Sequence, residues 1–432
     1  MKFAPTLLCA AAWLTAAAAG ADTIAVTHGQ IVTLGGAGTI NNGTVIIKDG
    51  LIAAVGANLA IPQGARIIDA GGHVVTPGVV ASDTNLGARE VSEGEASTAD
   101  DAGATEQISA AFDVSLGINP ASMVIPVARM GGVTRAVVTP ELPGHGDKKG
   151  DKLFAGQAAV IDLSGNANSL SRTRVAVVAE LGTSAASHLG GSHASVLQLL
   201  EADLDEALSY AANKGGYEKG AHRPYRQSKE DLEALQPVLA GQEPLLVGVH
   251  RVADIRRVIA LGRRLKLKLI LSGAEEGWMM ASEIAAAGIP VLIDPQANLP
   301  EQFEELNSRL ENAALLQKAG AVVVIVPPHN ADYARQVRYN AGYAVAHGMA
   351  WEAAIAAIAR NPAQVFGFNA GRIEPGSEAD LVVWSGDPLE MLTLPEHVLI
   401  KGVEAPLTSR AQELARRYAT PEAQLPPAYR HN

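Results

Sequence analysis

The chain has 432 residues, of which 48% are hydrophobic and 18% are charged, so it can bury a large core and is not disordered throughout. Its formal net charge of −11 argues against a general nucleic-acid binder, because neutralising phosphates requires clustered Lys and Arg. Beyond the N-terminal residues, no segment is apolar for long enough to span a bilayer.

The N-terminal segment has the pattern of a secretory signal peptide. An apolar or small run extends from Leu7 to Ala19, and Ala19-Gly20-Ala21 fits a small-x-small cleavage site. We therefore expect residues 1–21 to be removed and the protein to be periplasmic or secreted; a buried N-terminal helix is the alternative. The single cysteine, Cys9, lies in this run, so the mature chain would have neither a disulfide nor a cysteine metal ligand.

Short strands with glycine turns follow, from Ala25 to Val75. Asp49-Gly50 is flanked by apolar runs and is typical of a two-residue hairpin turn, since both turn positions favour a positive φ. The C-terminal part is similar, with strands expected at 379–384 and 397–400. One small sheet or sandwich built from both chain ends is the economical arrangement.

Between these parts, strand-like and helical segments alternate. Apolar runs such as Ala158–Leu163 and Leu245–Val249 alternate with helical patterns such as Val252–Leu265. Strands that are apolar on both faces are typical of parallel sheets covered by helices. The pattern therefore predicts a parallel α/β architecture, open or closed.

Two motif blocks carry a resemblance to a known family. Residues 68–78 (IDAGGHVVTPG) and 371–384 (GRIEPGSEADLVVW) resemble the amidohydrolase superfamily, in its imidazolonepropionase-like and prolidase-like branch. The resemblance implies a (β/α)8 barrel over 79–369 and a composite β-sandwich from 22–78 and 370–404, with 405–432 as a C-terminal tail.

The resemblance also implies a metal site, and here the sequence departs from the family. Asp83 and Asn85 stand where the family has a His-x-His pair; because residues i and i+2 of a strand share a face, we expect these two side chains to converge. Gly248, Gly273 and Pro327 (Pro328 if the register shifts by one) replace the fifth-strand and sixth-strand histidines and the eighth-strand aspartate. Glycine and proline have no side chain that ligates a metal.

These losses favour a barrel that has kept its scaffold and given up its metal and cofactor. The favoured function is a catalytically impaired protein that binds a small molecule at the barrel mouth or forms a homo- or hetero-oligomer with an active relative. The acidic stretch from Glu90 to Glu106 follows the first strand and is expected to form a loop over this mouth.

The alternative is a hydrolase of carbon–nitrogen bonds, in cyclic amides or dipeptides, with a rebuilt site. Asp83, Asn85, His250 and His329 lie near the carboxyl ends of predicted strands, where barrel active sites form. One carboxylate and two imidazoles would hold a single zinc ion, and Glu180 would act as a base. For both histidines, hydrogen bonding within the barrel mouth is the stronger expectation.

Overall fold

The computed structural model describes residues 23–90, 99–105, 107–142, 152–189, 191–221, 223–297, 300 and 302–419. The expected signal peptide lies outside these residues, as do residues 420–432 of the tail and residues 91–98 of the acidic stretch. Within the described part, no helix combines the length and the hydropathy needed to cross a membrane.

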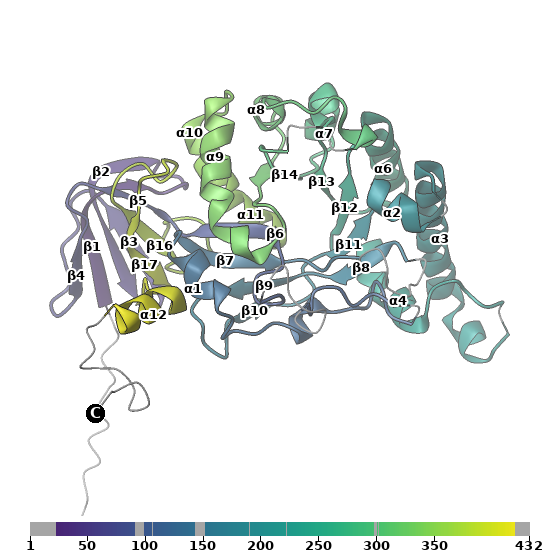
Figure 1. The fold of residues 1–432 in the computed structure, drawn as a ribbon, viewed down its shortest axis with the longest axis horizontal. Helices are drawn as coiled ribbons and strands as arrows, with labels where there is room; N and C mark the ends of the chain where they lie inside the picture. Colours follow the sequence, from purple (N-terminus) through teal and green to yellow (C-terminus); the bar gives the residue numbers. More distant parts are fainter. Residues whose placement is uncertain are drawn as a thin grey trace, which may run out of the picture.

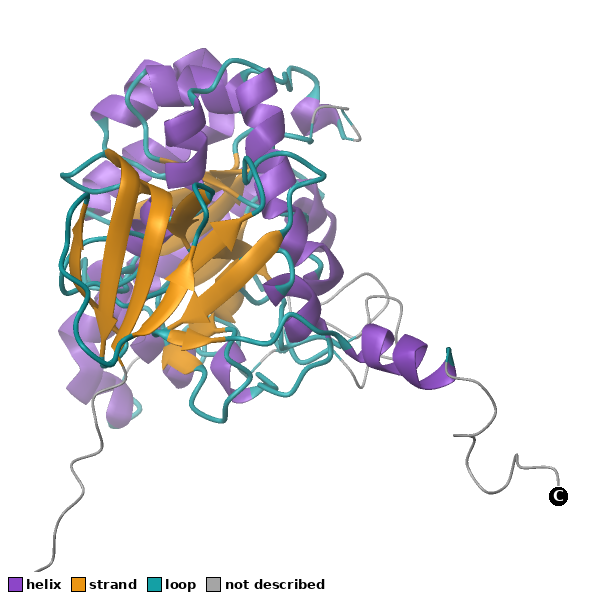
Figure 2. Ribbon diagram, turned by 90° about the vertical axis from the view of Figure 1, so that its left-hand side faces the viewer, coloured by secondary structure: helices purple, strands orange, loops and turns teal. Residues whose placement is uncertain are grey.

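The strands fall into three hydrogen-bonded sheets (Figures 1 and 2). They are β1 (Thr23–Val32), β2 (Thr39–Lys48), β3 (Leu51–Gly56), β4 (Arg66–Asp69), β5 (Val74–Pro77), β6 (Val79–Thr84), β7 (Val133–Val138), β8 (Phe154–Gln157), β9 (Ala159–Asp162), β10 (Leu170–Arg172), β11 (Val177–Glu180), β12 (Leu245–Val249), β13 (Leu269–Gly273), β14 (Val291–Ile293), β15 (Val323–Ile325), β16 (Leu381–Trp384), β17 (Pro395–Ile400) and β18 (Val403–Glu404).

The first sheet combines strands from both ends of the chain. Its order is β18-β17-β16-β5-β1-β2-β3, with β4 paired to β1, and it lies to the left in Figure 1. The junction between the two ends is the antiparallel pair β5–β16, in which Val75 lies opposite Val383. Both residues are buried in a separate apolar cluster of this sheet. Hydrogen bonding defines a single sheet here, so a two-layer sandwich stays a prediction.

The other two sheets contain the parallel strands. Strand β6 pairs in parallel with β7, and β11 to β15 form a continuous parallel series. Between these groups lie β9, antiparallel to β7, and β8, antiparallel to β11. The apolar run Ala158–Leu163 is therefore a strand, as expected, but it runs against its neighbours. A closed barrel of eight parallel strands is not completed by the pairing of the described residues and stays a prediction.

Helices cover the parallel strands along the top and right of Figure 1. They are α1 (Val124–Arg129), α2 (Thr183–His188), α3 (His193–Glu218), α4 (Lys229–Ala234), α5 (Gln236–Leu239), α6 (Val252–Leu265), α7 (Ala281–Ala286), α8 (Asn312–Lys318), α9 (Val337–Ala346), α10 (Trp351–Ala357), α11 (Arg360–Phe366) and α12 (Arg410–Tyr418), with 3-10 helices η2 (Val114–Leu116), η3 (Gly277–Met280), η4 (Phe303–Glu305) and η5 (Ala331–Gln336).

Helix α6 shows why the sequence folds this way. Ile255, Val258 and Ile259 recur at helical spacing and are buried against the sheet. Asp254 lies in the first turn, where the helix dipole favours an acid. Lys266, in the left-handed conformation, ends the helix.

A buried arginine joins the parallel strands to the composite sheet. Arg135 of β7 is 1% exposed, and its Nε donates to Asp380 Oδ2 at 2.5 Å. Its guanidinium also contacts Glu378, and both acids lie within the three residues before β16. The cost of burying this charge is offset only while its carboxylate partners remain.

We predict that Asp380→Ala destabilises the protein by about 3 kcal/mol, because it leaves the Arg135 guanidinium buried beside a single carboxylate. Urea denaturation followed by circular dichroism measures the change. Arg66→Ala is the matched control: it breaks the exposed Arg66–Glu404 pair and should cost less than about 1 kcal/mol. Equal losses in the two variants would contradict the anchoring role of Arg135.

Candidate functional site

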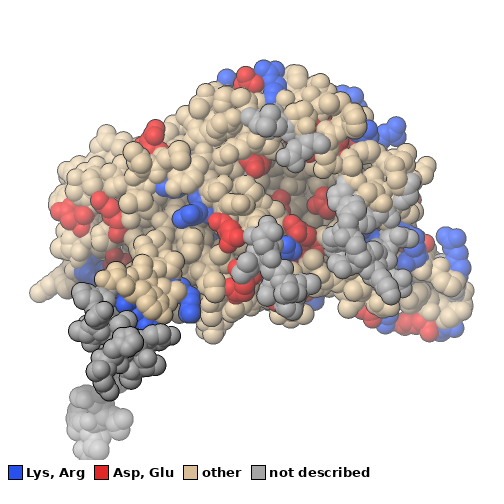
Figure 3. All heavy atoms as spheres, viewed as in Figure 1, with Lys and Arg blue, Asp and Glu red and all other residues tan. Residues whose placement is uncertain are grey.

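The candidate site lies at the carboxyl ends of the parallel strands. We call it the strand-end site and define it by the side chains of Asp83, Asn85, Asp101, Glu141, Glu180, His250, Glu275, Glu304 and His329. Figure 3 shows Asp and Glu side chains gathered around a hollow in the middle of the molecule.

Asp83 is placed by a β-bulge at the end of β6. The pairing with β7 shifts between Ser82 and Thr84, and Asp83 has a φ of 56°. Its carboxylate accepts hydrogen bonds from Thr139 Oγ1 at 2.7 Å and from Ser272 Oγ at 2.8 Å. Ser272 belongs to β13, so Asp83 reaches across to a distant strand end.

Sequence alternation predicts that Asp83 and Asn85 share a face, and the bulge at Asp83 interrupts that alternation. Asn85 Nδ2 donates to Asp101 Oδ2 at 2.9 Å, and its Oδ1 accepts from the backbone N–H of Ala331 at 2.6 Å. Both ends of the amide are therefore occupied by protein partners. Asp83 and Asn85 thus have different hydrogen-bond partners, and their convergence on one point stays a prediction.

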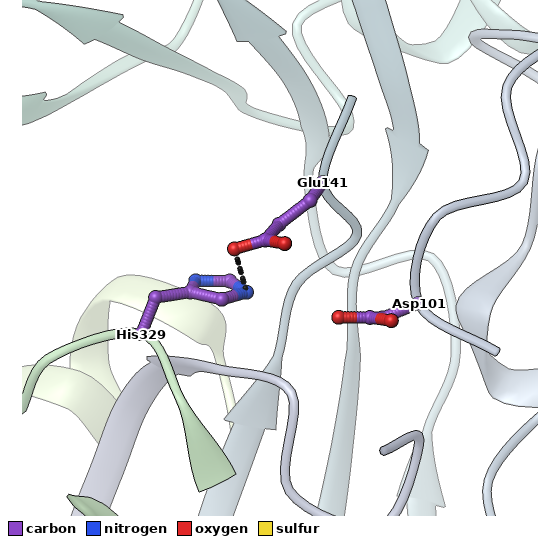
Figure 4. Close-up of side chains that lie close together, drawn as sticks. All are labelled: Asp101, Glu141 and His329. Carbon is purple, nitrogen blue, oxygen red and sulfur yellow. Dashed lines mark ion pairs between the residues drawn. The ribbon is translucent and has the colours of Figure 1, made fainter. Parts of the chain in front are cut away.

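His329 lies between two carboxylates, as Figure 4 shows in part. Its Nδ1 is 3.4 Å from Asp83 Oδ1, and its Nε2 is 3.2 Å from Glu141 Oε1. Burial alone lowers the pKa of His329, but Asp83 and Glu141 outweigh it and raise the pKa to about 9. Burial alone would raise the pKa of Asp83; its contacts with His329 lower it instead. The ring is therefore an imidazolium at neutral pH and has no lone pair for a metal.

Asp101, Glu141 and His329 together have the composition of a cation site, since one ligand atom from each lies within 4.8 Å of the others. A guanidinium is already there, however. Arg89 Nη2 donates to Asp101 Oδ1 at 2.9 Å and lies 3.5 Å from Glu141 Oε2. Because Arg89 neutralises these carboxylates, we assign the cluster to an ion-pair network and not to a metal.

Glu180 occupies the space that a side chain at position 248 would need. The two residues lie opposite each other in the β11–β12 pair, and a Cβ on Gly248 would be 2.1 Å from Glu180 Oε2. Burial raises the pKa of Glu180 to about 7, with nearby Asp83 adding to the rise while His250 and His329 oppose it. The Glu180 carboxyl can therefore occupy this strand end only because residue 248 is glycine.

His250 fills the corresponding space beside Gly273, whose own Cβ would be 2.7 Å from His250 Nδ1. That nitrogen is 2.6 Å from Glu275 Oε2, and Nε2 is 4.0 Å from Glu304 Oε1. Burial alone lowers the pKa of His250, but Glu275 and Glu304 raise it to about 9. His250 is therefore a second imidazolium and not a free ligand.

The residues at the family's metal positions do not fit a metal. Asp83 and Asn85 are engaged by protein partners, and Gly248 and Gly273 leave room for other side chains. Buried Pro327 lies two residues after β15 and has no side-chain donor atom for a metal. The expected bonding of His250 and His329 within this end of the fold is what the contacts show.

Sequence reasoning missed four members of the site. They are Asp101, which the sequence places only within the acidic stretch, and Glu141, Glu275 and Glu304. Glu141 has a usable signal, because it follows β7 by a few residues as Asp83 closes β6. Glu304 has none, since its buried side chain projects from a 3-10 helix that follows β14 in the chain.

Comparison with known proteins finds likenesses to amidohydrolases. The model of the amidohydrolase family matches residues 278–409. The chain is 23% identical over 391 residues to the amidohydrolase tasK of Hapsidospora irregularis, an alignment that covers 83% of this chain and 39% of tasK. It therefore spans about two fifths of the length of this curated relative.

Solved structures support the same fold. An amidohydrolase from Thermotoga maritima MSB8 has a TM-score of 0.78 and 23% identity, covering 88% of this chain and 99% of that chain. Molinate hydrolase has a TM-score of 0.53 and 17% identity, covering 95% of this chain and 98% of that chain. At these identities the likeness concerns the α/β fold and not the chemistry.

We predict that Gly248→Ala destabilises the protein by about 2 kcal/mol, because the new methyl collides with the Glu180 carboxylate. Adding Glu180→Ala should restore most of the loss, a coupling that a double-mutant cycle of urea denaturation measures. Gly215→Ala in α3 is the control: its Cβ would meet nothing within 4 Å, so it should be neutral or slightly stabilising. Additive effects of Gly248→Ala and Glu180→Ala would contradict the shared space.

The pKa of Glu180 also predicts a pH dependence of stability. Its folded pKa of about 7 exceeds its ordinary 4.5, so the folded state holds more protons between these values and the free energy of unfolding falls as pH rises through this window. Glu180→Gln should remove about 3 kcal/mol of this fall between pH 4.5 and 8. Glu201→Gln, at an exposed carboxylate of α3, should leave the profile unchanged. A Glu180→Gln profile parallel to wild type would refute the assignment.

Proposed function

We propose that this chain is a member of the amidohydrolase superfamily that binds a small cationic molecule at the strand-end site and lacks the metal-dependent hydrolysis of the family. The observation that carries the proposal is the filling of the ligand positions. The Glu180 carboxylate lies where a side chain at 248 would project, and His250 lies where one at 273 would project.

Hydrolysis by the family's route requires an ion that lowers the pKa of bound water from ~15.7 to ~7, and a carboxylate to take the proton. The donor set here does not supply the ion's ligands. Two glycines and a proline offer no donor, and His250 and His329 are held as imidazolium ions by carboxylates. A ligating side chain introduced at position 248 would collide with Glu180, so the packing around Glu180 requires glycine there.

The charge of the strand-end site indicates the class of ligand. Six carboxylates meet there, against the guanidinium of Arg89 and the two imidazolium groups. Glu180 is the carboxyl with no hydrogen bond or ion pair among the described residues. A surplus of carboxylates in a partly desolvated site attracts ammonium groups and repels anions. An amine placed beside Glu180 would give that carboxyl the donor it lacks.

A second function has one observation in its favour. Glu180, with a pKa of about 7, lies near the His250 imidazolium, and such a pair supplies a general base and a general acid without an ion. On this basis the chain would be a hydrolase of carbon–nitrogen bonds in cyclic amides or dipeptides. Zinc would bind at this site only by replacing the contacts of His250 and His329 with their carboxylate partners. A prolidase is among the structures of similar fold, at a TM-score of 0.53 and 15% identity.

We also propose export to the periplasm or the exterior, from the pattern of residues 1–21, and assembly with a second copy or with an active relative. A mass spectrum of the N-terminus after expression in a Gram-negative host tests the cleavage, and it should begin at Asp22. Size-exclusion chromatography with light scattering tests the assembly.

We predict that the purified full chain holds well below one equivalent of zinc or manganese by plasma mass spectrometry. It should not hydrolyse dipeptides, lactams or cyclic ureas, with or without added zinc. The second function would replace the first if turnover appeared and Asp83→Ala and His329→Ala each abolished it.

We predict that 1,4-diaminobutane raises the melting temperature and that succinate, the dianion of equal chain length, does not. Glu180→Gln should abolish the shift, whereas the exposed control Glu201→Gln should keep it. A shift with succinate, or an undiminished shift with diaminobutane in Glu180→Gln, would sink the cationic-ligand proposal.

A further inference from the structure

Three large apolar side chains reach solvent in the two short helices η3 and η4. They are Trp278 of η3, Phe303 of η4 and Leu306, which directly follows η4. Phe303 is 88% exposed and Leu306 is 61% exposed, whereas Trp278 is half-buried. We call these three residues the apolar rim. Single exposed apolar side chains are ordinary on a protein surface, but a group of them is typical of a binding surface.

Hydrogen bonds hold the two parts of the apolar rim side by side. Trp278 Nε1 donates to the carbonyl of Asn307 at 2.9 Å, and Asn307 Nδ2 donates to Glu276 Oε1 at 2.6 Å. Because Asn307 directly follows Leu306, the indole lies beside the turn that carries Leu306. Phe303 and Leu306 are three residues apart, and residues at this spacing share one face of a 3-10 helix. The three side chains therefore belong to one surface.

The apolar rim is continuous with the strand-end site through two carboxylates. Glu304 directly follows Phe303, is 3% exposed, and has its Oε1 4.0 Å from His250 Nε2. Glu275 lies three residues before Trp278, and its Oε2 is 2.6 Å from His250 Nδ1. Both acids thus contact the same ring inside the site. Successive residues of a 3-10 helix point about 120° apart, so η4 turns Glu304 inward and leaves Phe303 at the surface.

Charge and exposed apolar surface together select one kind of ligand. The surplus of carboxylates inside the strand-end site attracts an ammonium and repels an anion. At the edge of the site, an apolar chain that covered Phe303 and Leu306 would remove exposed apolar area from water, which is favourable. A second charge at the far end of the ligand would lie against these apolar side chains and lose that gain. The matching ligand therefore has one ammonium and one apolar chain.

We propose that the ligand of the strand-end site is an amphiphilic primary amine. Its ammonium lies among the carboxylates of the site, and its apolar chain extends over Trp278, Phe303 and Leu306. This inference rests on the function proposed above and adds the chemical class of the ligand. The apolar rim is then the part of the protein that determines specificity, since it distinguishes a long apolar amine from a short one.

Isothermal titration calorimetry of the full chain with 1-aminobutane and 1-aminooctane tests the proposal. The longer amine should bind at least about tenfold more tightly, since four methylenes would give about 200-fold if fully buried. In the double variant Phe303→Ser with Leu306→Ser, this ratio should fall to about twofold. Leu392→Ser is the matched control: Leu392 is 95% exposed in the connection between β16 and β17, so its loss should leave the ratio unchanged. Octanoate should not bind to wild type.

The outcomes separate this inference from the function on which it rests. Equal affinity for the two amines, with the diaminobutane shift intact, would overturn the apolar rim and leave the cation site standing. Absence of every amine response, diaminobutane included, would reject both. Undiminished binding of 1-aminooctane to Glu180→Gln would mean that the chain adheres to the surface without the site. A fall in oligomeric mass of the double variant, at an unchanged affinity ratio, would assign Phe303 and Leu306 to an interface between copies and overturn the proposal.

Discussion

The space left by glycine at the strand ends is the constraint on which the candidate site depends. Gly248 and Gly273 open two positions on neighbouring strands, and the side chains that enter are Glu180 and His250. A Cβ at either position would lie closer to these groups than real atoms approach. The glycines are thus part of a packed arrangement. The space in which a metal-ligating side chain would lie at positions 248 and 273 is occupied by the Glu180 carboxyl and the His250 imidazole.

Electrostatics follow from that packing. Carboxylates beside His250 and His329 raise the pKa of both rings to about 9, so both imidazoles carry a proton at neutral pH. Protonated imidazole is a donor to carboxylates and a poor neighbour for a divalent ion. The arrangement that stabilises the buried acids therefore also disfavours a divalent ion there, and the described side chains leave a surplus of carboxylates.

The sequence predicted the large features because they depend on pattern. Apolar runs alternating with helical spacing indicate parallel α/β layers, and strand patterns at both termini indicate one composite sheet, which the β5–β16 pairing confirms. Strand direction is different. Ala158–Leu163 is apolar like its neighbours, and nothing in its composition shows that β9 runs antiparallel to β7.

The site was predictable in what it lacks and less so in what it contains. Glycine at 248 and 273 and proline at 327 state directly that ligands are absent. What fills the space depends on register: Glu180 meets Gly248 only because β11 and β12 pair with those residues opposite. The bulge at Asp83 has the same character, since a positive φ at an aspartate depends on tertiary contacts that composition does not show.

Each end of the parallel strands has a buried carboxyl without a hydrogen-bond donor, and the two carboxyls have different surroundings. Glu180 and Glu243 are both carboxyls whose pKa burial raises to about 7, and neither has a hydrogen-bond donor among the described residues. Around Glu180 the protein places imidazolium groups that moderate the pKa, within a surplus of acids. Around Glu243 lie the cationic side chains of Arg172, Arg174 and Lys268, of which Arg174 opposes the rise in pKa. A buried acid without a donor destabilises the fold in either setting, and the charges beside it decide how far burial raises its pKa.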